Sequence, residues 1–114
     1  MEGCLFCKIA KGEIPAQVVY EDEQLMAFKD VNPVAPVHIL VIPKRHIPGV
    51  AALSESDKDL VGHIMLTIKN LAQDMSVTDN GYRAVVNQGE NAGQSVPHLH
   101  FHLLGGRPMD WPPG

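Results

Sequence analysis

The chain has 114 residues, 45% of them hydrophobic, which predicts one compact domain over residues 1–114 with its own core. Nine Lys and Arg against thirteen Asp and Glu give a formal charge of −4, which argues against binding along a long nucleic acid. The apolar runs are too short to cross a bilayer and two cysteines are too few for a disulfide framework, so we expect a soluble, cytoplasmic protein without membrane contact.

The first half of the chain predicts a short helix followed by three strands. Residues 4–11 have the composition of a brief opening helix. Residues 17–20 and 25–29 are strand-like and flank an acidic turn, which predicts a hairpin. The β-branched run 37–42 stops at Pro43 and predicts a buried strand.

One long amphipathic helix is predicted over about residues 55–75. The segment from Ser54 to Asp57 resembles a capping box, and the apolar residues after it recur at helical spacing. His63 falls outside this apolar stripe, so we expect its side chain in solvent. The apolar positions are Leu60, Val61, Ile64, Ile68, Leu71, Ala72 and Met75.

Two further strands are predicted after this helix. A turn at 79–81 leads into a strand at 82–87, and a glycine-rich loop from Gln88 to Ser95 leads into a strand at 98–104. The Pro- and Gly-rich tail 105–114 should be irregular. Strands, one long helix and then more strands predict an α+β domain with a largely antiparallel sheet.

The segment HLHFHLL, residues 98–104, holds three of the six histidines. Successive side chains of a strand point to opposite faces, so His98, His100 and His102 should line one face and the apolar residues between them the other. Three interpretations are open at this point. The row could be incidental on a surface strand, could supply two ligands to a zinc ion in a metallohydrolase, or could present a neutral imidazole as a nucleophile.

The residues just upstream of the row favour the nucleophile. The loop from Asn87 to Ser95 offers glycine-permitted backbone amides and a hydroxyl group next to the imidazoles. Concave arrays of amides bind phosphate oxygens, and phosphorus is a suitable electrophile for an imidazole nitrogen. The combination predicts a phosphoryl-transfer site.

With these residues in view, the chain resembles the histidine triad superfamily, whose signature His-φ-His-φ-His-φ-φ is matched throughout by residues 98–104. Nearly the whole chain is similar to the HINT branch. The closing Trp111-Pro-Pro-Gly is typical of that branch and not of the fragile histidine triad branch, while galactose-1-phosphate uridylyltransferases have glutamine at the position of the third histidine. The other matching segments are 4–9, 12–15, 28–30, 35–38, 41–46, 93–96 and 105–114.

The resemblance implies a HIT-like fold with a five-stranded sheet, and hydrolysis of the P–N bond between a purine nucleoside 5′-monophosphate and an amine. It implies that His100 attacks phosphorus to give a nucleotidyl-histidine, without a catalytic cofactor. The catalytic residues it implies are His100, His102, His98, Ser95 and His38. The nucleotide-binding residues it implies are Asp30, Val31, Asn87, Gly93, Gln94, Ser95, His100, His102 and Trp111.

Members of this branch are homodimers whose two sheets join into one larger sheet. The resemblance therefore implies a homodimer in which Trp111 reaches toward the site of the partner subunit. Simple packing of the tail would explain Trp111 equally well.

The pair Cys4-x-x-Cys7 indicates metal or redox chemistry. In zinc-bearing bacterial members the other two ligands correspond to His46 and His98, so the resemblance implies a structural zinc held by two thiolates and two imidazoles. A His98 that binds zinc could not also relay protons. Two ordinary buried thiols are the alternative.

Three other functions stay open beside the phosphoramidase. The first is a hydrolase of dinucleoside polyphosphates, from another branch of the superfamily. The second is a regulatory protein that binds purine nucleotides and hydrolyses them only incidentally. The third is the metallohydrolase, in which the histidine row would bind a catalytic metal.

Overall fold

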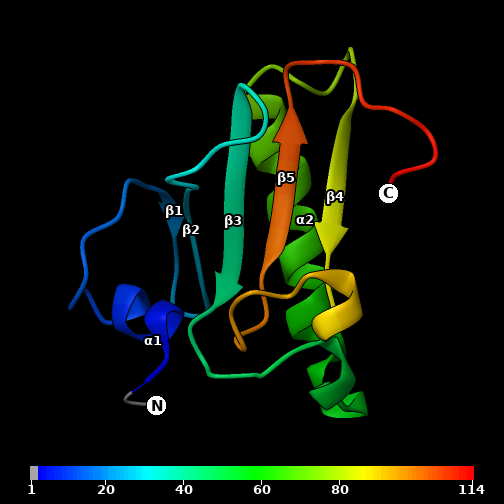
Figure 1. Ribbon diagram of the computed structural model, residues 1–114. Helices are drawn as coiled ribbons and strands as arrows, with labels where there is room; N and C mark the ends of the chain where they lie inside the picture. The colour runs from blue at the N-terminus through cyan, green and yellow to red at the C-terminus, as the bar shows by residue number, and fades with distance from the viewer. Residues whose placement is uncertain (1–2) are drawn as a thin grey trace.

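The computed structural model describes residues 3–114 and has an antiparallel sheet at its centre (Figure 1). The strand order is β1-β2-β3-β5-β4. The strands are β1 (Val18–Glu21), β2 (Leu25–Lys29), β3 (Val37–Pro43), β4 (Tyr82–Val86) and β5 (Phe101–Gly105). With the short helix α1 (Leu5–Ala10) and the long helix α2 (Lys58–Asp74), the five strands confirm the expected α+β fold. Within the described residues no helix is both long enough and apolar enough to cross a membrane.

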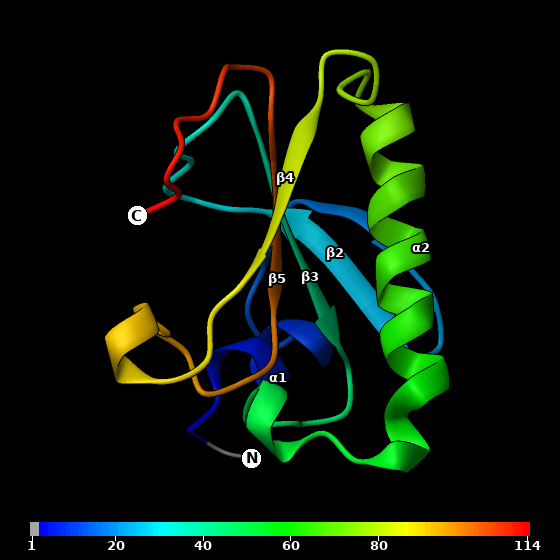
Figure 2. The same ribbon diagram turned by 90° about the vertical axis from the view of Figure 1, so that its right-hand side faces the viewer.

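Helix α2 covers one face of the sheet (Figure 2). Ile64, Ile68 and Leu71 of this helix are buried, as their spacing predicts, and they join the main core with the inward residues of β2, β3 and β5. Leu99, Phe101 and Leu103 belong to the same core. The apolar half of the HLHFHLL segment therefore faces α2.

Helix α1 packs on the opposite face and builds a second, smaller core. Phe6 and Ile9 of α1 pack there with Phe28 of β2 and with Leu40 and Ile42 of β3. Strand β3 is buried on both faces because Ile39 and Val41 face the main core while Leu40 and Ile42 face the smaller one. This explains why residues 39–42 of the strand form a continuous apolar run.

The long helix begins three residues later than its capping signal suggests. Glu55–Asp57 forms a turn of 3-10 helix, and regular α-helix starts at Lys58. The Asp57 carboxylate accepts a hydrogen bond from the Ser54 amide at 2.9 Å and also pairs with Arg45. Tying the carboxylate to the Ser54 amide tightens the first turn, and the helix then runs to Asp74.

The histidine segment corrects another expectation, because β5 begins only at Phe101. The pairing of β3 with β5 starts at Val41 and Phe101. Before that point the Leu99 amide donates instead to the carbonyl of Ile47, at 2.6 Å, outside the ladder. His98 and His100 thus precede the strand, although the alternation of faces continues through them.

His63 is not free in solvent, contrary to expectation. Its Nε2 lies 2.6 Å from Oδ2 of Asp22, which also accepts from the Tyr20 hydroxyl at 2.6 Å. The other oxygen of Asp22 accepts from the amides of Gln24 and Leu25, both at 2.8 Å. These hydrogen bonds hold the pKa of Asp22 well below its usual range, so the carboxylate ties the β1–β2 hairpin to α2 as an ion.

Candidate active site

Strands β3 and β5 bring two histidines together on the face away from α2. Leu40 pairs directly with His102, so His38, two residues earlier on β3, is the diagonal neighbour of His102. Nε2 of His38 lies 2.9 Å from Nδ1 of His102 and 3.3 Å from Oδ2 of Asp30, which follows β2. The register of the sheet thus builds an Asp30–His38–His102 cluster.

Hydrogen bonding fixes which nitrogens of this cluster carry protons. Nδ1 of His38 accepts from the Val34 amide at 3.1 Å, so the proton of the neutral ring is on Nε2. That Nε2–H donates to Nδ1 of His102. The proton of neutral His102 therefore lies on its Nε2, which is available to donate to a substrate.

Both rings of this pair are held in the neutral form. Burial, reinforced by the nearby His100 and His38, lowers the pKa of His102 to about 4. Burial also lowers the pKa of His38, against the opposing effect of the Asp30 carboxylate. At neutral pH the cluster therefore donates hydrogen bonds without carrying imidazolium charge.

His100 has the opposite tautomer. Its Nδ1 lies 2.7 Å from the carbonyl oxygen of His98, and because a carbonyl can only accept, this nitrogen must donate. In the neutral ring Nε2 then carries a lone pair. The ring is 5% exposed, 5.0 Å from the ring of Phe6 and 5.2 Å from that of His102, centroid to centroid.

The loop between β4 and the histidine segment is held by its own turn and by side-chain hydrogen bonds, among them those of Gln94. Gly93 adopts a left-handed conformation at φ 80°, which glycine adopts without strain. The side chain of Gln94 accepts from the Gly89 amide and donates to the carbonyls of Pro48 and Val96. Ser95 is exposed and Asn87 half-buried.

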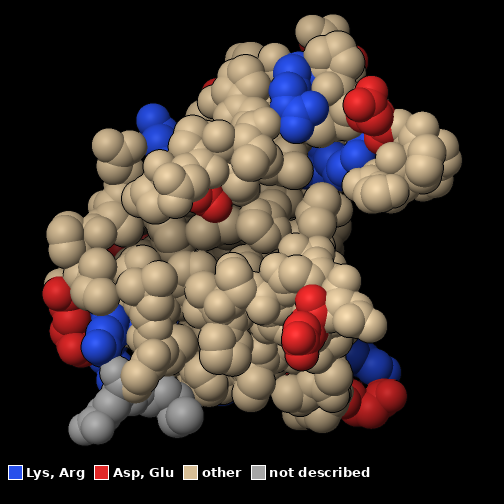
Figure 3. Space-filling view, viewed as in Figure 1, with Lys and Arg blue, Asp and Glu red and all other residues tan. Residues whose placement is uncertain are grey.

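The expected nucleoside residues lie beside a cavity of about 710 Å³. Its lining includes Asp30, Val31 and His38 but neither His100 nor His102, so Asp30 and His38 are common to the cavity and the Asp30–His38–His102 cluster. Val31 is 89% exposed and Trp111, on the C-terminal tail, is 82% exposed. Figure 3 shows that the surface on this side of the sheet is hollowed and mostly uncharged at its centre.

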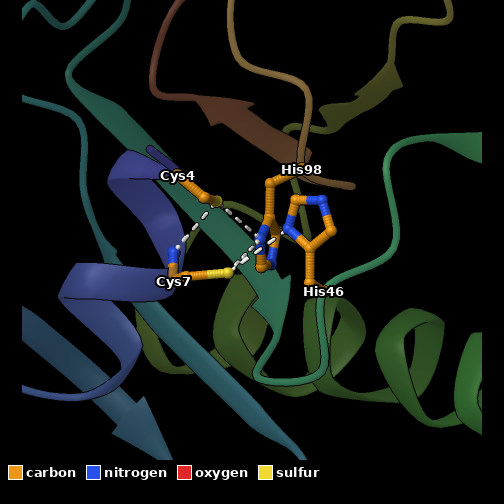
Figure 4. Close-up of side chains that lie close together, drawn as sticks. All are labelled: Cys4, Cys7, His46 and His98. Atoms are coloured by element: carbon orange, nitrogen blue, oxygen red, sulfur yellow. Dashed lines mark hydrogen bonds between the residues drawn. The ribbon is translucent and has the colours of Figure 1, made fainter. Parts of the chain in front are cut away.

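A separate group of four side chains lies at the other end of the histidine segment (Figure 4). Nδ1 of His98 is 3.2 Å from Sγ of Cys4 and 3.4 Å from Sγ of Cys7, and Nδ1 of His46 is 3.3 Å from Sγ of Cys7. One donor atom from each residue lies within 4.8 Å of the others. Nitrogen and sulfur ligands of one tetrahedral zinc stand about 3.5 Å apart, so the group could hold a metal.

The tautomers of the histidines favour this group, and not the Asp30–His38–His102 cluster, as a metal site. A histidine that binds a metal normally donates its other N–H to an acceptor. Nε2 of His98 lies 2.7 Å from the carbonyl of Pro43, which leaves Nδ1 unprotonated toward the thiols. In His38 the nitrogen away from the cluster faces the Val34 amide, a donor, so its Nε2 keeps a proton.

Although the donor atoms of Asp30, His38 and His102 also lie within 4.8 Å of one another, the geometry does not favour the metallohydrolase interpretation. It requires two neighbouring histidines of the row to converge on one ion, whereas His98 turns toward the cysteines and His102 toward His38 and Asp30. A metal at Cys4, Cys7, His46 and His98 would have four protein ligands and no open position, as structural sites do.

Several contributors were missed at the sequence level. Phe6 packs edge-on against Phe28, with 5.7 Å between centroids, and forms an apolar wall beside His100. Both residues lie in matching segments, but nothing in their local pattern indicates a site. The carbonyl of Pro43 and the amide of Val34 set tautomers through backbone atoms, and no side-chain pattern reveals them.

Comparison with known proteins agrees with this fold. The HIT domain model matches residues 11–109. An uncharacterized HIT-like protein of Synechocystis is 51% identical over 113 residues, which cover 99% of this chain and 98% of that protein. The chain therefore belongs to the HIT family.

Solved structures of the family superpose closely on this one. A HIT family hydrolase from Legionella pneumophila has a TM-score of 0.97 and 51% identity, with 98% of this chain and all of that chain covered. A histidine triad nucleotide-binding protein from Candida albicans has a TM-score of 0.82 and 33% identity, over 96% of this chain and 83% of that one. The fold is that of HIT family hydrolases.

Proposed function

We propose that this protein is a nucleoside phosphoramidase of the HINT branch, acting on a purine nucleoside 5′-monophosphate linked to an amine. The observation that carries the proposal is the opposed tautomers of two adjacent histidines. His100 is held with its Nε2 lone pair available, and His102 with its Nε2–H available. One ring is arranged to attack and its neighbour to donate.

In the proposed reaction Nε2 of His100 attacks the α-phosphorus. The P–N bond breaks, and the amine leaves with a proton taken from solvent, which the attacking water returns in the second step; His102 and Ser95 donate hydrogen bonds to the developing charge. Water then attacks the nucleotidyl-histidine, releasing the nucleoside monophosphate and restoring the imidazole. The net change is the addition of one water molecule across the P–N bond.

The nucleoside would bind at the cavity beside the cluster. Asp30 is partly exposed there, and its carboxylate can accept hydrogen bonds from both ribose hydroxyls. The exposed aliphatic side chain of Val31 can lie against the base. Asn87, Gly93 and Gln94 contribute to the phosphate side through the loop that they build.

Covalent trapping tests the proposal directly. Rapid acid-free quenching of the enzyme with an adenosine phosphoramidate should give a protein one adenylyl group heavier, with the group on His100 by peptide mapping. The same enzyme should turn over the phosphoramidate faster than a dinucleoside polyphosphate. Absence of the adduct during active turnover, or the reverse substrate order, would contradict the proposed activity.

We also propose that two copies form a dimer by joining their sheets. Strand β4 is the last strand of the sheet order, and its Tyr82 and Val86 are exposed. Met65 and Leu66 add exposed apolar surface on α2. An unpaired strand edge with apolar surface beside it is suited to pairing with a second copy.

Sedimentation should give twice the chain mass for the wild type. Tyr82→Lys places a charge on the proposed interface and should shift the measured mass toward that of the monomer. A wild-type monomer at all concentrations would contradict the dimer.

A further inference from the structure

The loop that precedes the histidine segment is braced against a distant part of the chain. Two glutamines make the connection, Gln94 to the carbonyl of Pro48 and Gln88 to the amide of Ala51. Residues 48–51 belong to the connection between β3 and α2, and they lie at the same end of the sheet as the loop in both ribbon views (Figures 1 and 2). Neither contact reaches the histidines.

Gln94 uses every polar group of its side chain within the protein. Its Oε1 accepts from the Gly89 amide at 2.8 Å, and its Nε2 donates to the Pro48 carbonyl at 2.8 Å and to the Val96 carbonyl at 3.1 Å. Its backbone amide donates to the Gly89 carbonyl at 3.1 Å. A side chain with these bonds intact has no donor left for a phosphate.

Gln88 holds the other side of the brace by a single bond. Its Oε1 accepts from the Ala51 amide at 2.9 Å. Gly49 leaves space for both glutamines, since a β-carbon at this position would stand 2.5 Å from Oε1 of Gln88 and 3.3 Å from Nε2 of Gln94. A methyl group at residue 49 would therefore push Gln88 out of its contact.

Ser95 has hydrogen-bond donors that the loop itself does not use. The Gly93 amide already donates to the Glu90 carbonyl at 3.0 Å. Among the hydrogen bonds of the described residues, none uses the amide or the hydroxyl group of Ser95. Ser95 is exposed and precedes His98 by three residues.

We propose that Gln94 and Gln88 are positioning residues, which clamp the loop to residues 48–51 so that the Ser95 donors are fixed for the phosphate attacked by His100. The inference rests on the proposed function and changes the role of Gln94 from contacting the nucleotide to holding the residue that does. Fixed donors contribute most in the transition state, where charge develops on the phosphoryl oxygens. Loosening the clamp should therefore lower kcat more than it raises KM.

Two matched substitutions test the clamp, each adding one negative charge to the same loop. Gln88→Glu keeps the oxygen that accepts from Ala51, so kcat for an adenosine phosphoramidate should stay within about threefold of wild type. Gln94→Glu cannot donate to Pro48 and Val96, so kcat should fall by about 10- to 100-fold, with KM changed by only about threefold. Gln88→Met and Gly49→Ala both remove the Ala51 contact, so both should lower kcat, as Gln94→Glu does.

Amide hydrogen exchange gives a readout that does not depend on catalysis. Exchange at Ala51 should accelerate in Gln88→Met and Gly49→Ala but not in Gln88→Glu, with overall melting temperatures close to wild type. Equal kcat values in Gln88→Glu and Gln94→Glu would overturn the clamp. If the wild type showed no phosphoramidase activity, the proposed function would fail, and the clamp would be tested by AMP affinity instead. A weaker affinity in Gln94→Glu than in Gln88→Glu would support the clamp. Equal affinities in the two variants would contradict it.

Discussion

Replacing His100 by alanine should abolish phosphoramidate hydrolysis, with kcat lower by about 10⁴- to 10⁶-fold, the range found when a nucleophile is removed. The reason is that neither of the other two histidines of the segment 98–104 has a lone pair available to the substrate. Nδ1 of His102 accepts from His38, and Nδ1 of His98 faces two sulfur atoms. Steady-state kinetics at saturating substrate measures the effect.

Removal of His102 provides the matched control. His102→Ala deletes a donor from the same face of the histidine segment, so its kcat should fall by a smaller factor of about 10²- to 10³-fold. It should still form the nucleotidyl adduct on His100, more slowly than wild type. His100→Ala should form none.

Binding distinguishes loss of the nucleophile from loss of the fold. AMP affinity of His100→Ala should stay within about tenfold of wild type, since Asp30, Val31 and the phosphate loop are unchanged. Turnover by His100→Ala within tenfold of wild type would show that another group performs the attack. The proposed mechanism would then be wrong even if the fold and the substrate were right.

Local pattern predicted the sheet and the long helix because burial and sequence period coincide in them. Residues 37–42 have the β-branched, largely apolar sequence of a buried strand because β3 is packed on both faces. The alternation in the histidine segment predicted which side chains share a face, and Leu99, Phe101 and Leu103 do lie in the main core. It did not predict where β5 begins, because the Leu99 amide bonds to Ile47, 52 residues earlier in the chain.

Pairings between distant residues explain the other differences. His63 was expected in solvent because it falls outside the apolar stripe of its helix, yet it binds Asp22 on the β1–β2 turn. The proton positions of His38, His98 and His100 depend on one amide and two carbonyls of the backbone. A residue pattern identifies the imidazoles but not the direction of their hydrogen bonds.

Binding of zinc by Cys4, Cys7, His46 and His98, which we propose from the resemblance and the geometry, predicts a large effect on stability. Helix α1 has only six residues, too few to be stable alone in water. The Cys4 side chain caps it by accepting from the Cys7 amide at 3.2 Å, and both sulfur atoms approach His98. A metal would therefore tie α1 to the start of the histidine segment.

Removal of this metal should lower the melting temperature by at least about 15 °C. Free zinc a thousandfold above its dissociation constant stabilises a folded site by about 4 kcal/mol, and each kcal/mol is worth about 4 to 8 °C in a chain of this size. The measurement is thermal unfolding with and without a strong chelator, with zinc content determined by elemental analysis. Re-addition of zinc should restore the melting temperature.

Two half-buried histidines give a matched pair for the same experiment. His46→Gln removes a proposed ligand, so it should lose zinc and the response to chelator. His63→Gln weakens the contact with Asp22 but should keep both. The cobalt-substituted protein should show the strong visible absorption of a tetrahedral thiolate site, and His46→Gln should lose it.

The competing interpretation, two ordinary buried thiols, makes the opposite prediction at every step. Burial, together with the neighbouring Cys4, raises the pKa of the Cys7 thiol, so without a metal the Cys7 thiol would stay protonated and uncharged. With such thiols the melting temperature would not change when chelator is added, and the protein would show no cobalt absorption. In that case Phe6 and its apolar neighbours alone would hold α1 in place, and the unprotonated Nδ1 of His98 would serve only as a hydrogen-bond acceptor for a thiol.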